Sequence, residues 1–197
     1  MKQRFSKRTR LVSALLTLAM VFTFLPFSAF AEDEVDYWVP LHSDNFPDKT
    51  FLEYISTTFD KGGGGWDDGE PNGILEPGEH RAVTEIDVRN KNITSLSGIS
   101  VFHNLKKLYC SNNQLTSLNL SYNTKLTQEN FECSGNKYPI IIDVTERTFD
   151  LSTLPEFDVT KASGWAGGTV VGNTLRVKPG ADRVTYTYDC GNGLTAQ

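Results

Sequence analysis

Apolar residues recur at regular intervals between residues 105 and 118 of the chain. They are Leu105, Leu108, Cys110, Leu115 and Leu118. Positions 108 and 110 lie two residues apart, so in a strand both side chains point to the same face. Asn113 follows in a turn, where its amide has donors and an acceptor for backbone groups that the bend leaves without partners. The pattern predicts a short strand, a turn, and a return of the chain to the same core.

The same pattern occurs once before and once after this stretch, with Val88 and Cys133 in the position of Cys110. These equivalent positions are 22 and 23 residues apart. The period, together with the spacing L-x-x-L-x-L-x-x-N-x-L, in which Cys takes the third apolar position, is typical of leucine-rich repeats. We therefore predict a short leucine-rich-repeat solenoid with parallel strands over residues 83–142. With the segments on either side, the fold class is α+β.

Two of the three copies depart from the pattern. The first has Lys91 where the turn Asn is expected, and in the third Leu126 precedes Phe131 by five residues instead of three. The longer spacing predicts a small bulge in the segment TQENF. Three repeats are about the minimum that can bury a solenoid core, and both ends of such an array need a cover.

Residues 1–31 have the pattern of a secretory signal. A basic start is followed by an apolar segment over 11–27 and by Ala29-Phe30-Ala31, a cleavage site of small residues. The alternative is an uncleaved membrane anchor, because the apolar run is nearly long enough to span a bilayer. The cleavage site favours removal, so we expect a mature chain without a membrane span, secreted or held at the cell surface.

Removal of the signal changes the net charge. The full chain has 19 basic and 24 acidic residues, and the signal takes five basic and no acidic residues, so the mature balance is 14 − 24 = −10. This balance disfavours nucleic acid and anionic membranes as partners. The mature length of 197 − 31 = 166 residues is sufficient for one compact body of about average domain size.

The segment 45–82 is predicted to form a helical cap before the repeats. Its apolar positions with helical spacing are Phe51, Leu52, Ile55 and Phe59, after a suitable helix start at Pro47-Asp48. Four glycines and an acidic stretch follow. This acidic stretch is similar to the calcium-binding loop of an EF-hand.

The acidic stretch has candidate calcium ligands in the order that an EF-hand uses. They are Asp68, Glu70, Asn72, Ile74 through its carbonyl, Glu76 and Glu79. Ca²⁺ takes about six to eight oxygen ligands, glycine at position 73 suits the sharp turn, and a final Glu can bind through both oxygens. Asp60 or Asp67 could serve in place of Asp68, because the glycines give the loop freedom. The alternative is a solvated acidic turn that binds no metal.

The pattern changes to alternation and turn signals in residues 143–197. Predicted strands cover 148–151, 169–171, 174–177 and 184–188, with turns at 172–173 and 178–182. We expect a small β-rich unit with Trp165 in its core. Because the chain stops soon after Asn192-Gly193, we expect little of a final strand, and an unpaired strand edge there would be a liability.

These motifs resemble those of exported bacterial leucine-rich-repeat proteins with an N-terminal EF-hand-like calcium turn. The shared motifs are Asn45-Phe46-Pro47-Asp48, the acidic turn, the strand sequence VTEIDV over 83–88 and the repeat over 108–118. The resemblance covers roughly residues 45–190, and internalin-type adhesins are a looser relative in architecture. It implies binding of a protein or another ligand instead of catalysis, by analogy alone, since fold does not fix function.

The residue types and spacings do not indicate an enzyme. None of the three histidines sits in a metal-binding pair. Cys110 and Cys133 occupy inward apolar positions, where cysteine is usually a small inert apolar residue. Neighbouring strands lie about 4.8 Å apart, which allows a disulfide between them, but we expect reduced thiols. Cys190 has no evident partner.

The outward side chains of the predicted repeat strands are the candidate partner-binding residues. They are Glu85, Asp87, Arg89, Lys107, Tyr109, Ser111 and Glu132. Tyr109 at the centre would anchor a partner, because aromatic side chains dominate the energetics of interfaces.

Two functions are compatible with the sequence. The first is a non-catalytic exported module that binds a protein or surface ligand through the outward residues, as an adhesin does. The second is a structural spacer or cap, braced by calcium, within a larger cell-surface assembly. A glycan-binding accessory domain has less support, because only Tyr109, Trp66 and Trp165 are candidates for exposed aromatic residues.

Overall fold

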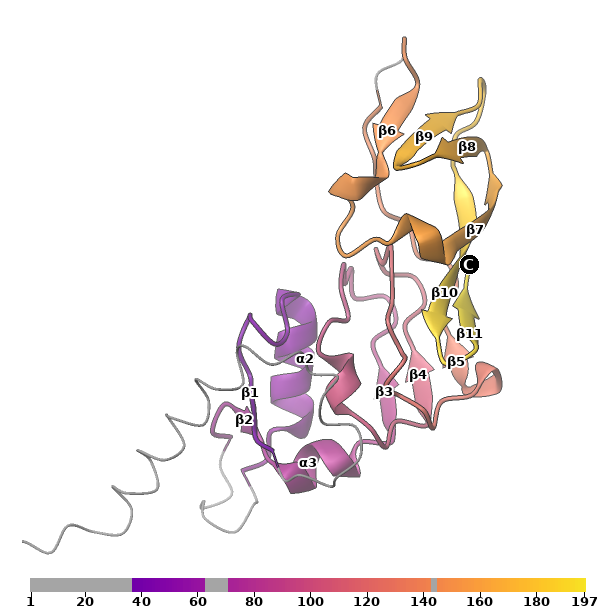
Figure 1. Ribbon diagram of the computed structural model, residues 1–197. Helices are drawn as coiled ribbons and strands as arrows, with labels where there is room; N and C mark the ends of the chain where they lie inside the picture. The colour runs from indigo at the N-terminus through magenta and orange to yellow at the C-terminus, as the bar shows by residue number, and fades with distance from the viewer. Residues whose placement is uncertain (1–36, 63–70, 143–144) are drawn as a thin grey trace, which may run out of the picture. The chain divides into compact units, whose positions relative to one another are not determined.

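The computed structural model describes residues 37–62, 71–142 and 145–197 (Figure 1). The predicted secretory signal over 1–31 lies outside these ranges. The described part combines helices with a small parallel sheet and antiparallel sheets, so the fold is a mixture of α and β elements. No helix within the described part is long and apolar enough to cross a membrane.

The first elements form a cap before the repeats. They are β1 (Val39–Pro40), α2 (Lys49–Phe59), β2 (Ile74–Leu75) and α3 (Pro77–Ala82). β1 and β2 pair as antiparallel strands, so the acidic turn lies between the end of α2 and a short sheet. The helix predicted from the apolar spacing is therefore present, and its inward side chains belong to the same core as the repeats.

Asp48 fixes the start of α2 to the first repeat. One oxygen of its carboxylate accepts hydrogen bonds from the amides of Thr50 and Phe51 at 2.9 and 3.0 Å, as a helix N-cap does. The other oxygen accepts from the amide and the hydroxyl of Thr94, at 2.7 and 2.9 Å. The Asp48 side chain thus caps the start of α2 and joins the cap to the solenoid.

Three parallel strands, one from each repeat, form the sheet of the solenoid (Figure 1). They are β3 (Glu85–Asp87), β4 (Lys107–Tyr109) and β5 (Phe131–Glu132). The register pairs Ile86 with Leu108, and Leu108 with Phe131. Equivalent positions of successive repeats therefore stand side by side, in agreement with the predicted period.

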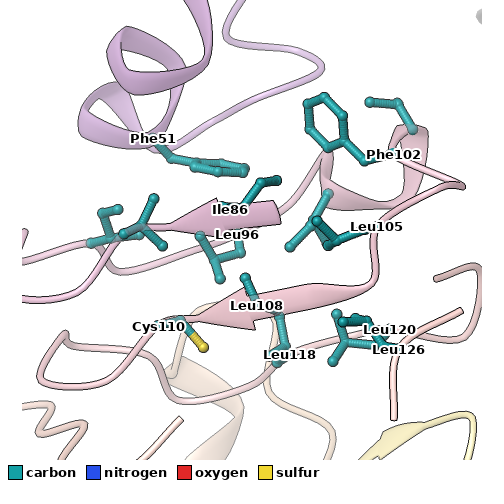
Figure 2. Packing of buried hydrophobic residues seen from close by; sticks show 14 of the residues in the cluster. Phe51, Ile86, Leu96, Phe102, Leu105, Leu108, Cys110, Leu118, Leu120 and Leu126 are labelled. Atoms are coloured by element: carbon teal, nitrogen blue, oxygen red, sulfur yellow. The ribbon is translucent and has the colours of Figure 1, made fainter. Parts of the chain in front are cut away.

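The inward side chains of the strands and turns fill one continuous core. Ile86, Leu108 and Cys110 have no exposed surface. Figure 2 shows these side chains packed with Leu118 from the following turn and with Phe51 from α2. Burial of each large apolar side chain stabilises the fold by about 1.5–3 kcal/mol relative to its exposed state.

Asparagine side chains close the turns of the repeats. The Asn113 carbonyl oxygen accepts from the amides of Lys91 and Ile93 at 2.9 and 3.1 Å, and its nitrogen donates to the carbonyls of Val88 and Cys110 at 2.7 and 3.1 Å. The Asn of one repeat therefore hydrogen-bonds the turn of the repeat before it. Position 91 belongs to the first repeat, and no repeat precedes it, which explains why Lys is accepted there.

The third repeat departs from the pattern where the sequence predicts a bulge. The 3₁₀ helix η3 (Gln128–Asn130) occupies this segment and leads directly into β5. The 3₁₀ helix η2 (Ile99–Val101) lies in the connection between β3 and β4 and does not lead directly into a strand. The extra residues of the third copy are thus taken up as a tight helical turn.

The C-terminal residues form two small antiparallel sheets. Their strands are β6 (Thr148–Asp150), β7 (Ala162–Ala166), β8 (Gly168–Val171), β9 (Thr174–Val177), β10 (Thr185–Gly191) and β11 (Leu194–Ala196), with the 3₁₀ helices η4 (Leu151–Thr153) and η5 (Val159–Lys161). The orders are β6-β9-β8 and β11-β10-β7. β6, β8, β9 and β10 correspond to the predicted strands.

β11 is a short final strand, as expected from the sequence, and it is paired. Its residues pair with β10 across the turn at Asn192-Gly193, so the end of the chain forms a hairpin. The prediction for Trp165 is modified: this residue is half-buried on β7, and its ring lies 4.8 Å from that of Tyr186 and 6.3 Å from that of Phe157. Trp165 therefore packs in an aromatic cluster at the margin of the core.

The β10–β11 hairpin supplies the second cover of the solenoid. Cys190 and Leu194 belong to the same buried core as the repeats, and the carbonyl of Cys190 accepts a hydrogen bond from the amide of Leu120 at 2.7 Å. Gly191 permits the close approach, because its φ is +82° and a Cβ there would collide with Ser121. The hairpin thus joins the solenoid core, while a second buried cluster, Leu151, Leu154, Leu175 and Val177, lies within the C-terminal unit.

Candidate functional site

β3, β4 and β5 present one outward face, defined here as Glu85, Asp87, Arg89, Lys107, Tyr109 and Glu132. The strand register places Glu85 beside Lys107, and Tyr109 between Asp87 and Glu132. The inward neighbours in the sequence are buried, so these side chains point away from the core. The fold thus gathers residues from three separate repeats on one surface, as the alternation predicted.

The charged residues of the outward face pair with one another. Lys107 Nζ lies 3.1 Å from a carboxylate oxygen of Glu85. Arg89 donates to both oxygens of Asp87, at 2.9 and 2.6 Å, and its Nη1 lies 4.0 Å from Glu132. These side chains retain 42–50% of their surface, so solvent screens the pairs and they add little to stability.

The pairing maintains the charges of the face. The hydrogen bonds from Arg89 hold the pKa of Asp87 below its ordinary value, and the same pair raises the pKa of Arg89. The hydrogen bond to Glu85 raises the pKa of Lys107. Asp87, Arg89 and Lys107 therefore stay charged throughout the physiological range of pH, so the face offers fixed charges of both signs to a partner.

Tyr109 lies at the centre of the face, half-buried between its neighbours. The guanidinium carbon of Arg89 lies 5.0 Å from the centroid of its ring, a cation–π contact. Because Arg89 also pairs with Asp87, the guanidinium is held over the ring. A partner that approaches this centre therefore meets an arginine stacked on a tyrosine.

Ser111 is not available to a partner, and this corrects its place among the predicted binding residues. Only 2% of its surface is exposed. Its hydroxyl donates to Glu132 at 3.0 Å and accepts from the amide of Ser134 at 3.1 Å. The third repeat covers Ser111, and the Ser111 hydroxyl holds the carboxylate of Glu132 in place.

Tyr54 of α2 extends the site beyond β3, and the strand pattern gave no signal for it. Its hydroxyl accepts a hydrogen bond from the amide of Asp87 at 3.3 Å, on the edge of β3 that faces the cap. The ammonium of Lys91 lies 5.5 Å from the centroid of its ring. The edge of the outward face is therefore lined by another tyrosine with a cation over it.

The acidic turn is described only in part, because the predicted ligands Asp68 and Glu70 lie outside the described residues. Asp60 directly follows α2 and is 2% exposed, and its carboxylate accepts from the amides of Asn72 and Gly73 at 3.1 and 2.8 Å. Gly73 has a φ of +77°, as the sharp turn of the prediction requires. The Asp60 carboxylate therefore joins the end of α2 to the sharp turn at Gly73.

The remaining predicted ligands make hydrogen bonds within the cap. Both oxygens of Glu79 accept from backbone amides, those of Lys61 and Gly62 on one side and that of Glu76 on the other. The side chain of Asn72 accepts from the amide of Ile74 at 2.9 Å. Within 37–62, 71–142 and 145–197, no three His, Cys, Asp or Glu side chains are grouped as metal ligands. Calcium binding stays a prediction that depends on the acidic residues of the turn as a whole.

The three cysteines form no disulfide and lie in the solenoid core or against it. Burial, then a hydrogen bond with Cys133, raises the pKa of the Cys110 thiol well above its ordinary value. Burial raises the pKa of the Cys190 thiol to about 12. Buried thiols with raised pKa values are poor nucleophiles, which favours the predicted packing role.

Comparisons with known proteins find a partial likeness. No family model and no curated protein matches the chain. Among solved structures, the functional domain of InlJ from Listeria monocytogenes, which includes a cysteine ladder, matches with 29% sequence identity and a TM-score of 0.41. The match covers 55% of this chain and 22% of that chain, so the matched part spans about a fifth of the InlJ chain.

Proposed function

We propose that the chain is an exported, non-catalytic interaction module that binds a protein or surface ligand through the outward face. The observation that carries this proposal is the strand register, which brings half-exposed charged residues from three repeats around Tyr109. Secretion or display at a bacterial cell surface is part of the proposal and rests on the signal pattern in residues 1–31.

The chemistry of the face favours a polar protein surface as the partner. Arg89 stacked on Tyr109 gives a rigid, amphipathic centre, and arginine and tyrosine are enriched among residues that dominate binding energy. Carboxylates and cations surround this centre, so charge complementarity would set the orientation of the partner. Three strands span only about 10 Å, which is small for a standard interface. The partner would therefore also contact Tyr54 and Lys91 beside β3.

The test compares two double variants with matched residue types. Lys107→Ala with Tyr109→Ala alters the outward face, whereas Lys125→Ala with Tyr122→Ala alters a surface outside β3, β4 and β5. Binding to a panel of host and bacterial surface proteins is measured with each purified variant. We expect the first variant to lose at least about ten-fold in affinity, the effect of one truncated interface hot spot, and the second to bind as the native chain does. Equal behaviour of the two variants would refute the proposal.

A structural spacer or cap is the second candidate, and one observation favours it. The charges of the outward face already pair with one another, as on a solvated sheet surface. In this function the calcium turn and the repeats would only hold the shape of a larger surface assembly. An unchanged cell-surface assembly in the Lys107→Ala, Tyr109→Ala strain, with loss of assembly after deletion of the chain, would support this alternative.

A further inference from the structure

A hollow of about 530 Å³ opens beside the outward face. Its walls come from the end of α2, from α3 and from the residues that enter β3, and they include Phe59, Glu79, Ala82 and Glu85. Glu85 belongs both to the hollow and to the outward face, so the two surfaces are continuous. The volume lies within the range of about 300–1,000 Å³ that is typical of ligand pockets.

One wall of the hollow is apolar and held in place. Phe59, Ala82 and Val83 contribute to it. The ring of Phe59 packs at 5.8 Å from the ring of Tyr54, edge to face, and at 5.8 Å from that of Phe102. Because these contacts fix the ring before any ligand arrives, an apolar chain that lies against it binds without the cost of ordering this wall.

The rim of the hollow is acidic, and its carboxylates are positioned by the backbone. Glu79 accepts from the amides of Lys61, Gly62 and Glu76, at 2.5, 3.0 and 2.9 Å. These amides orient the carboxylate but bring no positive charge to it. The ammonium of Lys61 donates to the carbonyl of Thr57 at the end of α2, at 3.2 Å. Glu85 meets its cation, Lys107, on the outward face.

We propose that the hollow receives a lysine side chain of the protein partner, an inference that rests on the proposed function. The methylene groups of that lysine lie along Phe59, Ala82 and Val83, and its ammonium lies between Glu79 and Glu85. Lysine fits better than arginine, because both oxygens of Glu79 already accept from amides and cannot offer the parallel pair that a guanidinium uses. Each N–H of an ammonium needs only one free lone pair on a carboxylate oxygen.

The test is an NMR titration of residues 32–197 with small probes, with a chelator present so that calcium does not compete for Glu79. The probes are Nα-acetyl-lysine amide and its neutral analogue, Nα-acetyl-norleucine amide. We expect the lysine probe to shift the amide signals of Ala82 and Glu85 in a saturable way, and to bind about five-fold more tightly than the norleucine probe, as a partly screened ion pair gives. Ala82→Trp, which fills the hollow, and Glu85→Gln should each weaken the lysine probe, while Glu53→Gln on the exposed side of α2 should not.

Equal shifts with the two probes, or shifts that do not saturate, would overturn the proposal. Failure of the lysine proposal can be distinguished from failure of the proposed function. If Tyr109→Ala abolishes partner binding but Ala82→Trp does not change it, the outward face binds the partner and the hollow does not hold its lysine. If no protein binds the chain, the lysine probe still decides what the hollow itself accepts.

Discussion

Gln128 and Thr195, which are 67 residues apart in the sequence, exchange two hydrogen bonds. The side-chain nitrogen of Gln128 donates to the carbonyl of Thr195 at 3.3 Å, and its oxygen accepts from the amide of Thr195 at 3.1 Å. Gln128 thereby occupies the outer edge of β11 with one amide group, as a neighbouring strand would. The edge that the sequence marked as a liability is closed by a side chain from the third repeat.

Gln128→Ala should expose this edge. Two hydrogen bonds are lost at a solvent-exposed site, so we expect the free energy of unfolding to fall by about 1 kcal/mol. Urea denaturation measures this change, and hydrogen exchange at the Thr195 amide should become faster. Glu129→Ala, in the same 3₁₀ helix, is the control and should leave the exchange unchanged. If the two variants exchange alike, Gln128 does not protect the edge.

Asn113→Ala should destabilise the chain more than any other asparagine variant in the turns. It leaves two amides and two carbonyls of the buried turns without partners, so we expect a loss of about 3 kcal/mol or more. Asn136 makes similar bonds, but it is only partly buried, so Asn136→Ala should cost less. Chemical denaturation of both variants tests the order. A larger loss for Asn136→Ala would contradict the role given to Asn113.

Asp48→Ala should weaken both the helix start and its link to the repeats. Loss of the cap costs about 1–2 kcal/mol, and Thr94 also loses its partner. Burial alone would raise the pKa of Asp48, but hydrogen bonds from Thr94 and Phe51 outweigh burial and lower it from 3.8. Its contribution is therefore present above pH 3.8 and disappears as the pH falls through the lowered pKa. The native chain and the variant should converge in stability in acid, whereas Asp44→Ala, an exposed control, should match the native chain at every pH.

Cys190 should make the chain sensitive to alkali. Its pKa is raised from 9.0 to about 12, so the folded state favours the neutral thiol. The associated stability is complete below pH 9.0, and it decreases as the pH rises towards 12. Urea denaturation measures the free energy of unfolding at neutral pH and at about pH 10. Between these two pH values it should fall less for Cys190→Ala than for the native chain. An equal loss for Cys190→Ala and the native chain would contradict this role of the Cys190 thiol.

Calcium should stabilise the cap slightly if the acidic turn binds it. Extracellular sites of this kind bind at about 10⁻⁴–10⁻³ M, so millimolar calcium would add about 0.4–1.4 kcal/mol. Melting curves with calcium and with chelator measure the difference. Asp68→Ala with Glu70→Ala should abolish it, and an Asp60→Asn variant decides whether Asp60 also serves as a ligand. Identical melting curves for the native chain in both conditions would exclude a calcium brace.

The repeat register was predictable from the sequence because it depends on a local period. Leu108, Cys110 and Asn113 lie where the spacing placed them, and the outward residues follow from alternation within each strand. The inward and outward positions of each strand alternate along the chain, so the residue type at each position directly reflects whether it is buried or exposed.

The features that the sequence did not reveal depend on contacts between distant segments. Ser111 is polar in an outward position, and only the packing of the third repeat buries it. β11 is short and pairs with β10, and its Thr195 bonds to Gln128, which no strand pattern includes. The hydrogen bond from the Gly73 amide to the carboxylate of Asp60 likewise joins residues that are 13 positions apart in the sequence.

The asparagine hydrogen bonds also bear on how such a chain changes length in evolution. Asn113 completes the coil before it, and its own coil is completed by Asn136 through the amides of residues 113 and 115. The asparagine that completes each of these coils therefore comes from the next coil, and not from the cap or the final hairpin. A duplicated gene segment that encodes one full period would fit between the existing coils, lengthen the exposed ribbon by one strand, and leave the cap and the final hairpin as they are.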